Sequence, residues 1–278
     1  TPEPFRSRVY NDASAIFLRR YWAHARIADL DAALNLSQQA EALTPPDSPD
    51  SPLCLSGLGI VLSERFIRSG RVEDLSEAIR VYEQAVSLTP PDSPALPIFL
   101  TNLGIGLSDR FAYSGNIEEL AAATIIFRRA CQSGLQVVPE EAVRSALNWG
   151  RLAAQRGVWL DAAEAYGYGL DAISRRFALQ FGRSGQASIL VRNQGLAANA
   201  ADAYAQISDS AAAVVAIERG RARMLAQSLE QNRRDLAALQ EMGHADLYER
   251  YQSAVATQQG QGKRKRGRGG AAAERKGK

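Results

Sequence analysis

The stretch Leu43-Thr44-Pro45-Pro46-Asp47-Ser48-Pro49 recurs 45 residues later as Leu88-Thr89-Pro90-Pro91-Asp92-Ser93-Pro94. The same shift maps Leu58-Gly59-Ile60 onto Leu103-Gly104-Ile105. It also maps two further pairs, Arg65-Phe66 onto Arg110-Phe111 and Ser69-Gly70 onto Ser114-Gly115. A period of this size is typical of solenoids in which each helical pair buries its apolar face against its neighbours.

The positions of proline and glycine within one unit predict two helices, A and B. The proline-rich connector is rigid, and its final Ser or Asp is expected to cap the following helix. Helix A is expected to run to Gly70 or Gly115, a residue type suited to a left-handed C-terminal turn. Helix B is expected over Leu75 to Leu88, where apolar residues follow the i, i+3, i+4, i+7 spacing of one buried face. These residues are Leu75, Ala78, Ile79, Tyr82, Ala85 and Val86.

The order of large and small residues in each unit resembles the tetratricopeptide repeat. That family has a large and then a small residue in helix A, followed in helix B by Ala, an aromatic residue, a second Ala and a closing Pro. This chain has Leu58-Gly59, Ala78, Tyr82, Ala85 and Pro90, and then Leu103-Gly104, Ala123, Phe127 and Ala130. Small residues are needed where the two helices of a hairpin cross at close range. The resemblance implies an all-α fold, a right-handed α-solenoid of tetratricopeptide-like hairpins; armadillo and HEAT repeats have similar periods but fit this small-residue pattern poorly.

The spacing departs from the standard repeat in the first units. Gly59 and Ala78 are 19 residues apart, whereas the standard repeat has about 12 residues between these positions. Helix A is therefore predicted to be longer by about two turns and to end in Arg65-Phe66 and Arg110-Phe111. A later hairpin returns to the standard spacing, with Trp149-Gly150, Ala162, Tyr166 and Gly169. A weaker one follows it with Ala200-Ala201, Tyr204, Ala213, Ile217 and Gly220.

These patterns divide the chain into consecutive segments. Residues 1–50 are expected to form a first, partial hairpin, 51–138 two long-helix hairpins of 45-residue period, and 139–175 a standard hairpin. Residues 176–232 are expected to form a degenerate hairpin with a linker helix, 233–259 a C-terminal helix, and 260–278 a disordered basic tail.

The net charge of +3 hides an uneven distribution. The segment from Lys263 to Lys278 holds eight Lys or Arg and one Glu, a local charge of +7, so the remaining residues sum to −4. The run Lys263-Arg264-Lys265-Arg266 could attract RNA, DNA or a nuclear import receptor electrostatically. It lacks interleaved aromatic residues for base stacking, so no specific nucleic-acid binding is expected, and a solvated tail or a sequence-frame artefact is the simpler interpretation.

The two cysteines, Cys54 and Cys131, have neither a disulfide framework nor metal-ligand spacing, and both are expected to be small buried hydrophobes. No basic region followed by an apolar run marks a signal peptide, and no apolar run is long enough to cross a membrane. A cytoplasmic protein without cofactor or metal is therefore expected.

The C-terminal third resembles a second family. The residues that carry this resemblance are the strings Ala213 to Leu225, Asp235-Leu236-Ala237-Ala238-Leu239, Leu247 to Tyr251, and Gly195 to Ala201. They are similar to the region that precedes the protease domain of CHAT proteins, which are caspase-like proteins associated with tetratricopeptide repeats. The resemblance covers most of residues 20–258 and implies a chain that holds a protease domain, in cis or in trans.

The chemistry of such a protease is missing from this sequence. A CHAT protease needs a Cys nucleophile and a His that takes its proton, both in strand-rich segments. This chain has only His24, expected at a helix end, and His244, expected in a loop, and neither has a nearby Cys. No phosphate loop or metal cluster appears either, so no enzymatic activity is expected.

A groove lined by the A helices is the predicted binding site for a protein or peptide. The position two before the small residue holds Gly57, Asn102, Asn148 and Asn199 in successive hairpins. An amide both donates and accepts, so three asparagines in register could hold an extended peptide backbone. The groove neighbours one turn on are Ser63, Ser108, Asp109, Arg151 and Gln155. The alternative is that these asparagines merely support the hairpins.

Two functions follow. The leading one is a non-catalytic interaction scaffold, the regulatory or sensing part of a CHAT-type protease system. The alternative is a stand-alone adaptor that binds an extended peptide in the asparagine-lined groove.

Overall fold

A computed structural model of the chain describes residues 3–179, 195–220, 246, 247, 249 and 250. The chain divides into two units, Thr1–Gly220 and Arg221–Lys278. The helices that follow belong to the first unit. Of the predicted segments, 233–259 lies mostly outside the described residues, and 260–278 lies wholly outside them.

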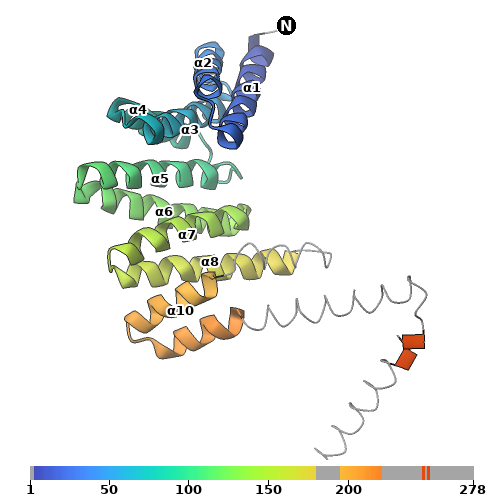
Figure 1. The fold of residues 1–278 in the computed structure, drawn as a ribbon, viewed down its shortest axis with the longest axis vertical. Coiled ribbons are helices and arrows are strands. Elements are labelled where there is room, and N and C mark those ends of the chain that lie inside the picture. Colours follow the sequence, from blue (N-terminus) through green and yellow to red (C-terminus); the bar gives the residue numbers. More distant parts are fainter. Residues whose placement is uncertain (1–2, 180–194, 221–245, 248, 251–278) are drawn as a thin grey trace, which may run out of the picture. The chain divides into compact units, whose positions relative to one another are not determined.

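The described part of the first unit consists of helices joined by short turns and contains no strand. Its helices are α1 (Glu3–His24), α2 (Ile27–Leu43), α3 (Ser51–Ser69), α4 (Val72–Ser87), α5 (Leu96–Ser114), α6 (Ile117–Val137), α7 (Pro139–Gln155), α8 (Trp159–Leu179) and α10 (Leu196–Gln206), followed by helical residues 210–220. Consecutive helices pack as antiparallel hairpins, and each hairpin packs on the next (Figure 1). The predicted all-α solenoid of helical hairpins is confirmed.

The two helices of each hairpin cross at the small residues that the repeat pattern predicted. A Cβ atom placed on Gly59 would lie 2.4 Å from the ring of Tyr82, and one on Gly150 would lie 2.4 Å from the ring of Tyr166. Gly104 stands in the same relation to Phe127, at 2.7 Å. Each aromatic ring of helix B therefore occupies the space that a side chain on helix A would need, which confirms the physical reason for the small residue.

The predicted end of helix A is also confirmed. Gly70 and Gly115 follow α3 and α5 in the left-handed conformation, with φ of 71° and 70°. Their N–H groups donate to the carbonyls of Phe66 and Phe111 at 2.7 and 2.8 Å. These bonds satisfy carbonyls that the helix end would otherwise leave open.

The predicted role of the connector as a helix cap is wrong. Asp50 precedes α3 in a helical conformation and its side chain makes no capping bond, and Ala95 takes the same place before α5. The Ser48 hydroxyl instead accepts from the N–H of Asp50, at 3.2 Å. It therefore fixes the turn before the helix. A proline at the first turn of each helix removes one of the donors that a cap would satisfy.

An arginine clasp joins the two helices of each of the first three hairpins. Arg20 pairs with Asp29, Arg65 with Asp74, and Arg110 with Glu119, always nine residues apart and always at the 45-residue period. The arginine lies in the extra turns of helix A, and the acid lies in the first turn of helix B. Asp29 and Asp74 are buried. α4 begins at Val72, three residues before the predicted start, and so includes its clasp acid.

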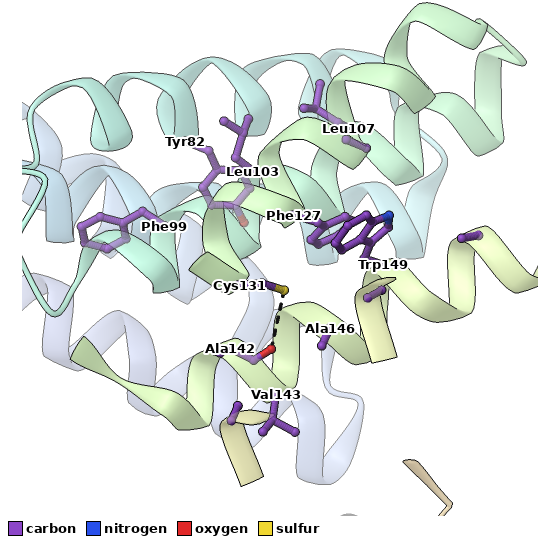
Figure 2. Packing of buried hydrophobic residues seen from close by; sticks show 14 of the residues in the cluster. Tyr82, Phe99, Leu103, Leu107, Phe127, Cys131, Ala142, Val143, Ala146 and Trp149 are labelled. Carbon is purple, nitrogen blue, oxygen red and sulfur yellow. Dashed lines mark hydrogen bonds between the residues drawn. The ribbon is translucent and has the colours of Figure 1, made fainter. Parts of the chain in front are cut away.

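The core continues from hairpin to hairpin. Phe127 of α6 and Trp149 of α7 are both buried in it (Figure 2). The Cys131 thiol donates to the carbonyl of Ala142 at 3.8 Å, and burial raises its pKa to about 12. Cys54 is buried as well, so both cysteines are small core residues, as expected.

Candidate functional site

The A helices α3, α5 and α7 lie side by side, and their shared face holds most of the predicted site residues. Asn102 is only 7% exposed. Its amide donates to the Ser56 hydroxyl of α3 at 3.2 Å, and its carbonyl oxygen accepts from Arg144 of α7 at 3.2 Å. Asn102 therefore ties three helices together, and both ends of its amide are already used.

The other two predicted asparagines have different surroundings. Asn148 is half-buried, and its amide donates to the carbonyl of Arg144 on its own helix at 2.9 Å. Asn199 lies exposed on α10, and its side chain forms no hydrogen bond within the described residues. In the first position of this register, a Cβ on Gly57 would lie 2.5 Å from the side-chain oxygen of Asn11. The three amides are in register but are not equivalent.

The hydroxyl of Tyr82 reaches this face from helix B. Its ring passes over Gly59, and its oxygen lies 3.3 Å from the Ser63 hydroxyl. Burial raises the pKa of Tyr82 well above its usual value, and the charges of Asp109, Arg144 and Glu64 also act on it. The phenol thus contacts α3 through Ser63, and charged residues of α3, α5 and α7 act on it electrostatically.

Asp109 of α5 is the electrostatically unsatisfied group of this cluster. It is half-buried, and it forms no hydrogen bond or ion pair within the part of the chain that the structure describes. Burial raises the pKa of its carboxyl from 3.8 to about 6. Arg144, the cation that also acts on Tyr82, donates to Glu141 at 2.8 Å and to Asn102 and does not pair with Asp109. A shifted carboxyl without a neutralising partner is a candidate contact for a ligand.

The remaining predicted residues flank the cluster. The Ser108 hydroxyl donates to the Gly104 carbonyl on its own helix at 2.7 Å. Arg151 and Gln155 are exposed on α7, and neither side chain has a polar partner among the described residues. The structure thus places Ser63 against the Tyr82 hydroxyl and brings the charge of Asp109 to act on it, while Asn102 lies between Ser56 and Arg144. Arg151 and Gln155 lie on the next A helix and Asn199 on α10.

Sequence reasoning missed three members of this cluster, namely Tyr82, Arg144 and Ser56. The apolar spacing predicts Tyr82 as a buried aromatic residue of helix B, and its ring takes that place while its hydroxyl contacts Ser63. The equivalent residue of the next hairpin is Phe127, which has no hydroxyl. That difference between two otherwise matching copies was the available signal.

The described residues were found to hold neither a metal-type cluster nor a membrane-spanning helix. No group of three or more His, Cys, Asp or Glu side chains gathers there as it would around a metal. No helix among them is long and apolar enough to cross a bilayer. His24 ends α1, as expected, and His244 lies outside the described residues.

Solved structures of similar fold are helical-repeat proteins. A putative kinesin light chain of Podosopora anserina with nearly identical TPR-like repeats matches with a TM-score of 0.52 and 16% identity, over 81% of this chain and 97% of that one. A second structure of that protein, a point variant, matches with a TM-score of 0.52 and 17% identity, over 84% and 99% of the two chains. No protein-family model and no curated protein matches the sequence. The likeness shows the fold, an all-α stack of TPR-like hairpins, and the function must be argued from the site.

Proposed function

We propose that this chain is a non-catalytic scaffold that binds an extended segment of another protein along the face shared by α3, α5 and α7. The observation that carries the proposal is the desolvated carboxyl of Asp109, which has no hydrogen-bond or ionic partner among the described residues and whose charge acts on the Tyr82 hydroxyl. A lysine, an arginine or an amino terminus of the bound segment would neutralise this carboxyl. On α7, Asn148 would then contact the backbone of the segment, and the exposed Arg151 its acidic groups.

The energetics favour an outside partner over a purely structural role. At pH 7 a carboxyl with a pKa of about 6 is ionised, and holding it in its desolvated place costs on the order of 3 kcal/mol. The fold offers Asp109 nothing in return, because no cation of the described residues pairs with it. A cation supplied by a ligand would recover part of this cost on binding.

The test is a selection of displayed, capped nonapeptides of random sequence against the whole chain. We expect peptides enriched in Lys or Arg, which bind Asp109→Asn at least tenfold more weakly. Arg80→Ala is the matched control, because Arg80 lies exposed on helix B, paired with Glu77. Selection of no peptide, or equal binding to Asp109→Asn, would contradict the proposal.

A second candidate function rests on the resemblance of most of residues 20–258 to CHAT proteins. In it, the stack positions or restrains a protease domain, in cis or in trans. Its test is the coding sequence beyond Gln259, where a strand-rich segment with a Cys and a His is expected. Peptidase activity of this chain alone would contradict a non-catalytic scaffold in either form.

A further inference from the structure

A second surface lies between the B helices α4 and α6. A cleft of about 640 Å³, open to solvent, runs between α4 and α6. Its floor is formed by Leu103 and Leu107 of α5 and its walls by Val86 of α4 and Ile126 of α6. The cleft is thus apolar at its base and bounded by two helices.

The next pair of B helices shows how such a space is closed. α6 and α8 pack directly against each other. Arg128 of α6 makes two bonds of 2.8 Å to Glu164 of α8, and Gln132 donates to the Tyr168 hydroxyl at 3.2 Å. Among the described residues, no side-chain bond or ion pair joins α4 to α6. The α6–α8 contact is therefore held by side-chain hydrogen bonds, whereas none spans the cleft between α4 and α6 in the described part of the chain.

Unpaired charges of opposite sign line the two sides of the cleft. Arg129 lies on the α6 side and Glu83 on the α4 side, and both are exposed. Neither has an ionic partner within the described part of the chain. Arg110 also lines the cleft, but its charge is taken by Glu119. The cleft therefore offers an apolar base with a cation and an anion available on opposite sides.

We propose that this cleft binds an amphipathic α-helix of a partner protein. A helix laid between α4 and α6 would place apolar side chains over Leu103 and Leu107, in the manner of helix-in-groove recognition. The two available charges determine its flanks, an acidic residue toward Arg129 and a basic residue toward Glu83. A small molecule fits less well, because the polar groups lie on opposite sides and do not converge.

The charge pattern gives a reciprocal test with three synthetic helical peptides that share one Leu and Ala face. One carries Glu on one flank and Lys on the other, the second carries Glu on both flanks, and the third carries Lys on both. Wild type should prefer the mixed peptide, Arg129→Glu the Lys peptide and Glu83→Lys the Glu peptide. The double variant should return to the mixed peptide. Each exposed pair is worth up to about fivefold in affinity at low salt.

Two further measurements make the result decisive. Ala122→Trp fills the cleft wall and should weaken all three peptides at least tenfold. The charge variants alter only exposed side chains without an ionic partner in the described residues, so their melting temperatures should match wild type. The proposal is overturned if the order of the peptides is the same in all four proteins, or if Ala122→Trp changes nothing. It is also overturned if the chain self-associates and Ala122→Trp abolishes this, because the occupant is then a second copy.

Discussion

At the scale of single residues, Asp109 destabilises the folded chain and is also the proposed contact for a ligand. Burial raises the pKa of its carboxyl in the folded chain from the ordinary value of 3.8 to about 6. The folded state therefore binds a proton more tightly than the unfolded state, and the stability contribution of this group falls as the pH rises from 3.8 to 6. Above pH 6 the carboxyl is ionised in both states, and the full free-energy cost of burying its charge is present.

Asp109→Asn should therefore stabilise the protein at pH 7, by about 2–3 kcal/mol. The gain should shrink toward zero as the pH falls to 4, because wild-type Asp109 is then neutral in the fold. Urea unfolding of both proteins at pH 4, 5, 6 and 7 measures the difference. A variant less stable than wild type at pH 7 would mean that an internal partner holds the carboxylate.

The Gly59 position tests the hairpin crossing. Gly59→Ala places a Cβ within 2.4 Å of the Tyr82 ring, so we expect a loss of about 1–3 kcal/mol from overpacking. Tyr82→Leu should cost less in the Gly59→Ala background than in wild type, since it opens the space. Chemical unfolding of the four proteins gives this coupling energy. Additive costs would show that the ring does not limit the crossing.

At the scale of elements, the arginine clasp explains the long helix A. Arg65→Ala leaves Asp74 buried without its cation, and we expect a loss of about 2–4 kcal/mol. Arg80→Ala removes the exposed pair with Glu77 and should cost under about 1 kcal/mol. Arg65→Met combined with Asp74→Leu should recover most of the Arg65 loss. Thermal unfolding that ranks the two single variants equally would reject the clasp.

Structural elements were predictable from the sequence where two copies of the repeat have the same residues at equivalent positions. Two copies 45 residues apart mark the turns at Gly70 and Gly115 and the crossing at Gly59, because these depend on contacts within one hairpin. The bonds of Asn102 were not predictable, since Ser56 and Arg144 lie 46 and 42 residues away in other hairpins. Which residues meet there depends on how hairpins stack. The prediction that the connector caps the next helix failed because Ser and Asp side chains form hydrogen bonds in turns as well as in helix caps.

At the scale of the whole first unit, each hairpin contacts mainly its sequence neighbours. Stability in such a stack is close to a sum of hairpin terms and neighbour interfaces, so damage should stay local. Trp149 is suited to test this, because it is fully buried in α7 and Arg128 of α6 lies 5.0 Å over its ring. It belongs to the α7–α8 hairpin and to the interface of that hairpin with α5–α6.

Trp149→Ala should cost about 3–5 kcal/mol within its own hairpin. Amide hydrogen exchange should rise strongly in α7 and α8 and less in α5, α6 and α10, while α1 and α2 keep the wild-type rate. Because two further hairpins separate α7–α8 from α1–α2, the α7–α8 hairpin can open without opening α1–α2. Mass spectrometry of exchanged peptides resolves these helices. A uniform rise in exchange from α1 to α10 would show one all-or-none unit, and the additive description of the stack would then fail.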